Sequence, residues 1–308
     1  MRLILASAPA LLPVMAFENL ANITNVIWPL CFACFLALLR APANRKEGAF
    51  AATVAFVGTA SNGLAALFLP LAVYAVWRRR TRAQHLVLAG YGLGLAVQAA
   101  ALVGSGGPAS GGPVHGLGRE FLARVLAGSV VGEQWARALF EGHGYGVLEI
   151  PAAAVLVLIA YLLLRSRGER RELGGIALGY SVVVFAAPLL VRGTVGLRLV
   201  AGLGFSAAAR YVGLSTLLLL SGIFIMVGAP TLKPRVGAAL AAIFLVQYLV
   251  VVVFAIPAAN FRSSGPEWTV ALSRAATQCR ETKQDHLAVP ITPGGWSVTL
   301  PCAQIRAG

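Results

Sequence analysis

Long apolar runs, separated by short polar or basic stretches, cover most of this chain. Runs of this length predict membrane-spanning helices, because about 20 apolar residues cross the hydrocarbon core of a bilayer. Met1–Ala16 also fits a cleaved signal peptide, but its two prolines favour a membrane helix. The uninterrupted runs are Leu3–Ala16, Thr24–Leu39, Leu86–Val103, Val147–Leu164, Ile176–Val191, Tyr211–Ala229 and Val236–Ile256.

One further run, Ala49–Trp77, is too long for one ordinary crossing and short for two. The polar stretch Thr59–Gly63 interrupts it in the middle. We expect two short helices that meet at this break, as a thin pair of crossings or a re-entrant hairpin, because a polar break at membrane depth must be buried in protein or line a wet cavity. The alternative is one long tilted helix with a kink, which would invert the direction of every later segment.

The composition agrees with a membrane protein. Of the 308 residues, 58% are hydrophobic and only 12% are charged, whereas roughly 25% are charged in soluble domains. A formal net charge of +14 would suggest nucleic acid as the partner of a soluble protein. Here the basic residues gather between apolar runs, so membrane lipid is the expected partner and nucleic acid is not.

Four basic clusters, together with Arg2, hold 14 of the 25 positive charges. The positive-inside rule places all of them in the cytoplasm. Two crossings within Ala49–Trp77 then give about eight to nine membrane segments, with the N-terminus inside and the C-terminal tail outside. The clusters are Arg40, Arg45 and Lys46; Arg78, Arg79, Arg80 and Arg82; Arg165, Arg167, Arg170 and Arg171; and Lys233 and Arg235.

The outer face then carries eight of the eleven acidic residues, so we expect chemistry or recognition there. Glu18 lies in the first outer loop beside Asn19 and Asn22, where it can act as a general base or bind hydroxyl groups. The simpler interpretation is an exposed loop with helix-capping asparagines. Glu149, at the start of a membrane helix, fits a functional role and a structural salt bridge equally well.

Arg210 and Tyr211 open an apolar helix at the outer face. The guanidinium of Arg210 can bind a phosphate group through two hydrogen bonds, or it can anchor the helix to lipid headgroups. Gln98, in the middle of an apolar helix, is expected to make an interhelical hydrogen bond. No set of His, Cys, Asp or Glu residues has the spacing of a metal site.

A segment between two membrane helices, about 119–141, has apolar residues at helical spacing. Pairs of opposite charge such as Glu120 and Arg124 are four residues apart, as on helices, and Gly128 and Gly132 divide the segment. We expect two short helices on the outer membrane interface. The charge pairs are expected on a solvated face.

The C-terminal tail has a different pattern, in which Glu267–Cys279 predicts a short helix and Leu287–Ile291 and Trp296–Leu300 predict a β-hairpin. Cys279 and Cys302 flank the hairpin. Outside the membrane we expect a disulfide between them, which closes a loop of about 24 residues and stabilises the tail by roughly 3 kcal/mol. Cys31 and Cys34 lie within an apolar helix, where small packing residues are the expected role.

The expected fold class is therefore an all-α polytopic membrane protein with a small disulfide-closed α/β tail outside the cytoplasm. The transmembrane helical domain covers residues 1–257 and includes the interfacial helices. The tail, a short helix plus a β-hairpin, covers residues 258–308.

Residues scattered over most of the chain carry a family resemblance. They are Glu18-Asn19, Asn22, Asn25 and Trp28; Ser61-Asn62-Gly63 and Leu69-Pro70-Leu71; Gln98; Arg210-Tyr211; and, in the tail, Phe261–Ser263, Gly265–Trp268, Cys279 and Trp296–Cys302. In these residues the chain resembles a group of largely uncharacterised bacterial polytopic membrane proteins, which are similar in turn to the GT-C glycosyltransferases. The resemblance implies a bacterial plasma-membrane protein that takes a polyprenyl-phosphate sugar as donor and a cell-envelope glycan as acceptor.

The resemblance also implies an inverting sugar transfer, in which Glu18 activates the acceptor hydroxyl and Arg210 holds the donor phosphate. GT-C enzymes commonly carry an Asp in the first outer loop, whereas Asp285 is the only aspartate in this chain. Three alternatives account for this difference. Glu18 takes the place of the Asp, the helices that usually come earlier in these enzymes are missing here, or the protein has no catalytic activity. The alternative function is a non-catalytic membrane protein, a transporter-like or scaffold subunit that binds lipid or glycan.

Overall fold

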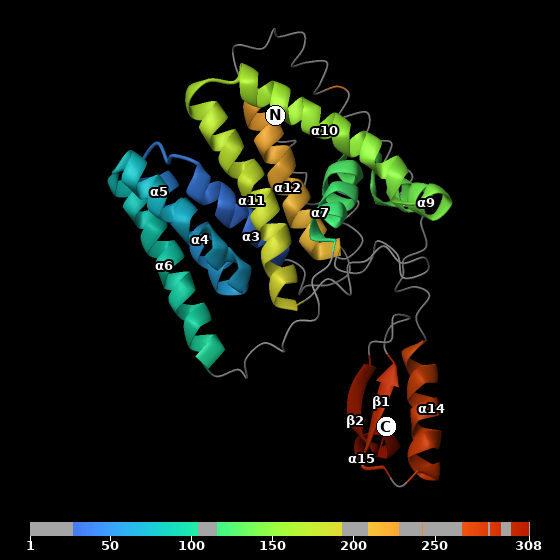
Figure 1. Ribbon diagram of the computed structural model, residues 1–308. Coiled ribbons are helices and arrows are strands. Elements are labelled where there is room, and N and C mark those ends of the chain that lie inside the picture. The colour runs from blue at the N-terminus through green and yellow to red at the C-terminus, as the bar shows by residue number, and fades with distance from the viewer. Residues whose placement is uncertain are drawn as a thin grey trace. The chain divides into compact units, whose positions relative to one another are not determined.

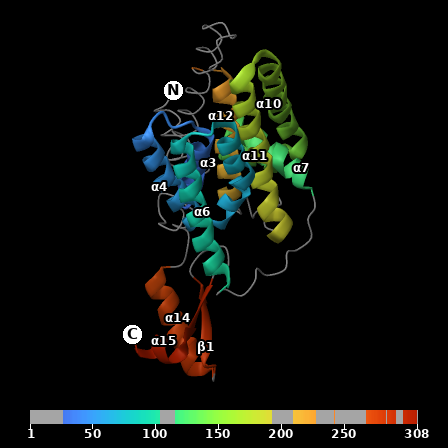
Figure 2. The ribbon, with the colours of Figure 1, turned by 90° about the vertical axis from the view of Figure 1, so that its left-hand side faces the viewer.

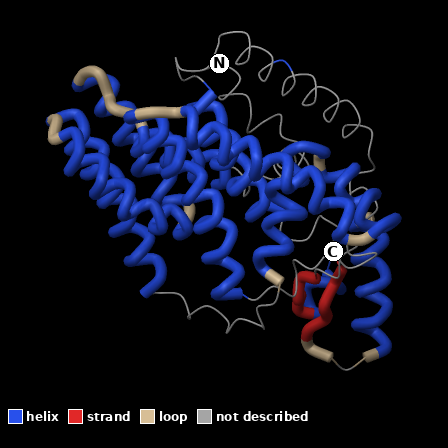
Figure 3. Tube along the Cα trace, turned by 45° about the horizontal axis from the view of Figure 1, so that its top comes forward, coloured by secondary structure: helices blue, strands red, loops and turns tan. Residues whose placement is uncertain are grey.

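The structure, a computed structural model, describes residues 27–103, 116–192, 209–227, 242, 267–282, 284–290 and 297–307. Contacts divide the chain into two compact units, Met1–Ala255 and Ile256–Gly308, next to the boundary expected at residues 257/258. The predicted helices Leu3–Ala16 and Val236–Ile256 lie outside the described residues, apart from Ala242. Among the described residues, strands occur only in the second unit (Figure 3).

The described part of the first unit consists of helices and short helical turns (Figure 1). Its first half contains α3 (Ile27–Leu39), α4 (Arg45–Ser61), the 3₁₀ turn η2 (Gly63–Phe68), α5 (Leu69–Arg79) and α6 (Arg82–Val103). Its second half contains α7 (Leu117–Glu120), the π-helical η3 (Phe121–Ala127), α8 (Gly128–Val131), α9 (Glu133–His143), α10 (Tyr145–Arg165), α11 (Gly168–Arg192) and α12 (Ala209–Val227).

Three helices, α6, α10 and α11, are long and apolar enough to cross a membrane, and two shorter apolar helices lie in α3 and α12. Large apolar side chains such as Ile150, Val157 and Leu164 are exposed on α10. Such a surface suits lipid rather than water, which agrees with an integral membrane protein. The count of eight to nine crossings and their orientation stay predictions.

The polar break within Ala49–Trp77 turns the chain back. α4 runs antiparallel to α3, because Gly58 lies against the backbone of Leu30. α5 then returns to the end where α3 stops, where Nη2 of Arg79 donates a hydrogen bond to the carbonyl oxygen of Leu39 at 2.9 Å. The prediction of two short helices is therefore confirmed, and a single kinked helix is excluded.

Local sequence explains where these elements begin and end. The side chain of Asn44 accepts a hydrogen bond from the backbone N–H of Glu47 at 2.9 Å and caps α4. Oδ1 of Asn62 accepts from the N–H of Leu64 at 3.0 Å and caps η2 in the same way. Arg80 ends α5 in a left-handed conformation, with φ of 44°.

The helices α4 and α6 lie parallel in close contact, and small residues make this approach feasible. Gly48 meets Ala83 near one end, whereas Gly94 meets the backbone of Phe56 near the other. Residue numbers rise together along both helices, so the two run in the same direction. Two helices that run in the same direction need a segment between them that leads the chain back. η2 and α5 form this return segment between α4 and α6.

The second half contains an antiparallel pair, α11 and α12, which lie side by side in Figures 1 and 2. Gly174 and Gly222 face each other across this pair, and the hydroxyl of Ser181 donates to the carbonyl oxygen of Ser215 at 2.8 Å. α12 is enclosed by protein, since its residues from Val212 to Gly222 are all buried.

An aromatic cluster joins the two halves of the bundle. The rings of Phe35 on α3, Phe68 on η2 and Tyr180 on α11 contact one another, with centroids 5.4 to 5.7 Å apart. The backbone N–H of Leu71 also donates a hydrogen bond to the hydroxyl of Tyr180 at 3.2 Å. Aromatic pairs at such distances contribute about 0.5–1.5 kcal/mol each beyond their buried area.

Three of the predicted basic clusters lie at one end of the bundle, which we call the basic end (residues 40–46, 78–82 and 165–171). An ion pair of 3.5 Å joins Arg79 to Glu169, and Oγ of Ser166 lies 3.5 Å from the carbonyl oxygen of Met226. The described helices therefore cross the bundle an even number of times between these clusters, as the positive-inside interpretation requires.

The second unit contains α14 (Trp268–Glu281), β1 (His286–Pro290), β2 (Ser297–Pro301) and α15 (Cys302–Ala307). The strands pair antiparallel, with Leu287 opposite Leu300, and lie within one residue of the predicted positions. The sequence analysis did not predict α15, and the turn between the strands lies outside the described residues.

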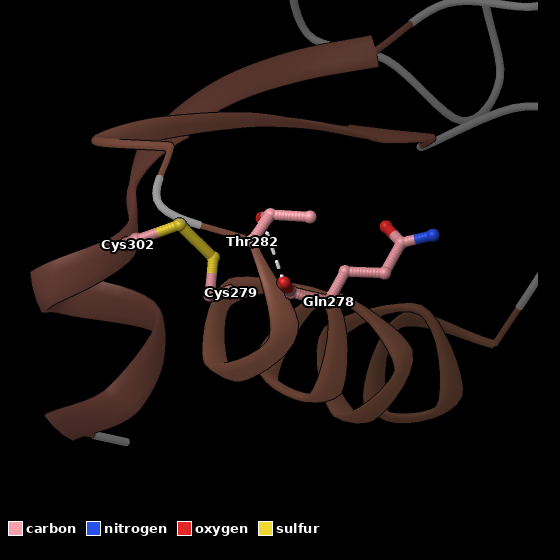
Figure 4. The surroundings of a disulfide bond; sticks show 4 residues. All are labelled: Gln278, Cys279, Thr282 and Cys302. Atoms are coloured by element: carbon pink, nitrogen blue, oxygen red, sulfur yellow. Dashed lines mark hydrogen bonds between the residues drawn. A yellow bond between two sulfur atoms is a disulfide. The ribbon is translucent and has the colours of Figure 1, made fainter.

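The expected disulfide between Cys279 and Cys302 is present and joins the end of α14 to the start of α15 (Figure 4). Both cysteines are buried together with Ala271, Ala275 and Val289 in a small core. The disulfide therefore reinforces a unit whose apolar core is small.

Replacement of Cys279 by Ser should destabilise the second unit by about 3 kcal/mol, because the unfolded chain gains the freedom of an open loop. The measurement is limited proteolysis of the purified protein, with fragments identified by mass spectrometry. Reduction of the parent protein should give the same cleavage in the tail. Equal resistance of the parent and C279S proteins would contradict this role.

Replacement of Gly94 by Ala should destabilise the first unit by about 1–3 kcal/mol, because overpacking separates α4 from α6. The new Cβ would lie 2.7 Å from the carbonyl oxygen of Phe56 and 2.8 Å from Cβ of Thr59. Gly92→Ala on the same helix is the matched control, since its Cβ would meet nothing within 4 Å. Thermal unfolding in detergent should rank Gly94→Ala clearly below Gly92→Ala.

Candidate functional site

The end of the bundle opposite the basic end gathers polar groups from several helices, and we call it the polar end (Asn62, Gln98, Glu120 and Tyr145). α4 runs 17 residues from Arg45 to the break, a length of about 25 Å at 1.5 Å per residue. α10 likewise begins at Tyr145 and reaches the basic end at Arg165, a length of 21 residues. Both stretches therefore separate the polar groups from the basic clusters by nearly the full length of the bundle.

The first polar group at this end is the break between α4 and η2. Nε2 of Gln98 on α6 donates a hydrogen bond to the carbonyl oxygen of Ala60, which confirms the interhelical role predicted for Gln98. The side chain of Asn62 is 9% exposed. Its Nδ2 is buried and has no hydrogen-bond partner among the described residues, so this amide retains unused donor capacity.

The second polar group is a buried pair of charged residues. Glu120 is 3% exposed and Arg124 is 2% exposed, and the hydroxyl of Tyr145 donates a hydrogen bond to Oε1 of Glu120. The backbone around Arg124 is π-helical. This conformation is rare in proteins overall, but where it occurs it is often at a functional site. An ionisable pair buried among apolar helices is costly unless its groups are paired and hydrogen-bonded.

The burial of Glu120 and Arg124 corrects the sequence interpretation. The segment from Leu117 to Val131 is continuous helix with Gly128 inside it, and it breaks only at Gly132. It packs against α10 and α12, with Phe121 in edge contact with Phe185 of α11. The expectation of a solvated charge pair is wrong for Glu120 and Arg124, because the face of the helix that carries them packs against neighbouring helices.

An exposed layer covers the buried pair. The guanidinium of Arg119 lies 4.3 Å from the centroid of the Tyr145 ring and 3.7 Å from the carboxylate of Glu149. Both charged side chains are more than half exposed, at 57% and 59%. Exposed ion pairs of this kind contribute about 0–1 kcal/mol. Glu149 therefore forms the salt bridge that was one of its two predicted roles.

The remaining predicted site residues fall in parts that the structure does not describe. Glu18, Asn19 and Asn22 lie outside the described residues. Arg210 and Tyr211 lie in the first turn of α12, but their side chains are outside the description. The roles expected for Glu18 and Arg210 therefore stay predictions. Among the described residues, no group of three or more His, Cys, Asp or Glu side chains could hold a metal ion.

Sequence reasoning missed the importance of Glu120, Arg124 and Tyr145. A signal was available in Phe121–Val131, where Arg124 is the only charged residue among 11. A helix that is apolar all round is buried, and a charge within it is buried as well. The link to Tyr145 could not be found in this way, because it depends on how α10 packs.

Comparison of the chain with protein-family models, curated proteins and solved structures finds no match.

Replacement of Tyr145 by Phe should destabilise the first unit by about 1–3 kcal/mol, because the buried carboxylate of Glu120 loses a donor. Tyr161→Phe on the same helix is the control, since Tyr161 is 41% exposed. The measurement is thermal unfolding in detergent. If Glu120→Gln restored the stability of Tyr145→Phe, the loss would be assigned to the carboxylate. Equal stability of both Tyr→Phe variants would contradict the buried contact.

Proposed function

We propose that this protein is an integral membrane glycosyltransferase of the GT-C type, which transfers a sugar from a polyprenyl-phosphate donor to a cell-envelope acceptor. The observation that carries the proposal is the buried pair Glu120 and Arg124 at the polar end. An ionisable group inside a membrane helix bundle marks a functional site by default, because its burial is costly. The buried pair marks the polar end as the place for chemistry. In this proposal Glu18 and Arg210 supply the acid–base group and the cation that transfer from a phosphate-linked sugar needs.

Chain connectivity supports the roles proposed for the residues outside the description. The first loop, with Glu18, leads directly into α3, whose second turn packs on Gly58 beside the polar break. α12 carries Arg210 in its first turn and reaches the basic end near Met226. The described starts of α3 and α12 therefore both lie toward the polar end, which supports a role there for the residues that adjoin them.

The proposed chemistry is an inverting displacement. The acceptor hydroxyl oxygen attacks the anomeric carbon while the bond from this carbon to the phosphate oxygen breaks. The carboxylate of Glu18 takes the hydroxyl proton, and the electron pair of the broken bond leaves with the polyprenyl phosphate. The guanidinium of Arg210 stabilises the charge that develops on this phosphate.

The other proposed substrate contacts surround these two residues. Asn19 and Asn22 donate hydrogen bonds to sugar hydroxyls, and Tyr211 lies beside the phosphate. Glu149, exposed next to Arg119, faces the acceptor. The polar end and the C-terminal unit lie outside the bacterial plasma membrane in this proposal, because the positive-inside rule assigns the basic end to the cytoplasm.

Replacement of Glu18 by Gln should lower sugar transfer by about 10²–10⁴-fold, the usual contribution of a general base. The assay follows transfer from a radiolabelled polyprenyl-phosphate sugar to envelope glycan by purified protein in liposomes. Glu281→Gln, an exposed acid in the second unit, is the matched control and should keep the parent rate. Arg210→Gln should raise the KM for the donor as well as lower kcat.

Two results would sink the proposal. Equal rates for the parent and Glu18→Gln proteins would exclude Glu18 as the base. Donor that is bound by the parent protein, but never transferred to any glycan offered, would assign the chain to the non-catalytic alternative that binds lipid or glycan.

A further inference from the structure

The basic end carries far more positive charge than its carboxylates balance. Counted with the adjoining Glu47 and Glu172, it holds eleven Lys and Arg side chains and three Glu side chains, which leaves a net charge of +8. The basic residues are Arg40, Arg45, Lys46, Arg78, Arg79, Arg80, Arg82, Arg165, Arg167, Arg170 and Arg171. Like charges gathered at one end repel one another, so a partner that supplies negative charge is needed.

All three carboxylates of this end already have partners in the protein. Glu47 pairs with Arg40 at 3.0 Å, and Glu169 pairs with Arg79 at 3.5 Å. Glu172 accepts a hydrogen bond from the hydroxyl of Tyr74.

Six other exposed arginines of this end form no ion pair with a carboxylate in the described part of the chain. Arg79 has a structural role instead. Its side chain is only 14% exposed, and it connects α5 to α3 through the carbonyl oxygen of Leu39 and to α11 through Glu169. The surface for a partner is therefore made by the residues around it. We call these residues the arginine rim: Arg78, Arg80, Arg82, Arg167, Arg170 and Arg171, all exposed.

Exposed apolar side chains lie directly beside these cations. Trp77 is 65% exposed and precedes Arg78, and Leu164 is 79% exposed and precedes Arg165. Phe50, one helical turn after Lys46, is 74% exposed. Tryptophan and arginine are found together where lipid headgroups meet acyl chains. This mixture favours a lipid surface over a soluble polyanion, which would contact basic and polar groups alone.

The backbone of Arg80 adds an independent observation. It is the only non-glycine residue with positive φ among the described residues, in a position that glycine occupies at lower cost. Strain of this kind persists where a side chain has a function. An arginine here extends the arginine rim between the end of α5 and the start of α6.

We propose that the arginine rim binds the phosphate groups of anionic phospholipids, and that phosphatidylglycerol is therefore enriched around this end of the protein. Basic surfaces between helices at the membrane boundary recognise such headgroups through charge. The inference does not depend on the proposed sugar transfer, because the rim lies at the opposite end of the bundle.

The experiment uses the full chain in nanodiscs of phosphatidylcholine, alone or mixed with phosphatidylglycerol. Native mass spectrometry counts the phosphatidylglycerol that stays bound after release from the nanodisc. The parent protein should retain it preferentially, and high salt should weaken the preference, because screening shortens the range of charge interactions. Removal of two rim charges in Arg80→Gln/Arg82→Gln should lower the preference by about tenfold.

Two further variants keep the test decisive. Arg80→Gly/Arg82→Gln removes the same charges and also relieves the left-handed strain, so it should fold at least as well and lose as much lipid. Arg274→Gln/Arg280→Gln removes two exposed charges from the second unit and should keep the parent preference. An equal loss in the rim and tail variants would overturn the proposal.

A last arm separates lipid from free phosphate. Phosphatidylglycerol should raise the unfolding temperature of the parent protein, whereas inorganic phosphate added to phosphatidylcholine nanodiscs should not. Stabilisation by inorganic phosphate to the same extent would overturn the assignment to lipid.

Discussion

The structure depends on one constraint, which is that a chain turning back inside a membrane helix bundle must satisfy its own backbone polar groups. At the break after Ser61, backbone groups lose their partners within α4. Side chains of α6 and of the break itself provide hydrogen bonds to these groups. Gln98 donates to the carbonyl oxygen of Ala60, and the hydroxyl of Tyr91 donates to that of Ala65 at 2.7 Å. Oδ1 of Asn62 accepts from the next turn. The parallel packing of α4 and α6 thus requires the turn and also stabilises it.

The turn also gives α5 its position between the two halves of the bundle. Because α5 returns to the basic end, Arg79 reaches the last carbonyl of α3 and the carboxylate of Glu169. At the other end of the same segment, Phe68 packs between Phe35 and Tyr180. One short helix therefore joins elements that are about 100 residues apart in the chain.

The two ends of the bundle carry different chemistry as a consequence. The basic end combines paired carboxylates, exposed arginines and exposed apolar rings, which suits a boundary with anionic lipid. The polar end combines the buried Glu120 and Arg124 with the unused amide of Asn62, which suits recognition of a polar substrate. In the two proposals made above, one end of the bundle binds lipid and the other end acts on a substrate.

The sequence by itself determined the helical class, the turn between two short helices, the interhelical role of Gln98 and the disulfide of the tail. Each of these follows from local pattern: run length, a polar break, a lone amide in an apolar helix, and two cysteines around a hairpin. Only the tertiary structure decided that Glu120 and Arg124 are buried and that Tyr145 donates to Glu120. A spacing of four residues fixes which side chains share a helix face, but the packing of neighbouring helices decides whether that face meets water or protein.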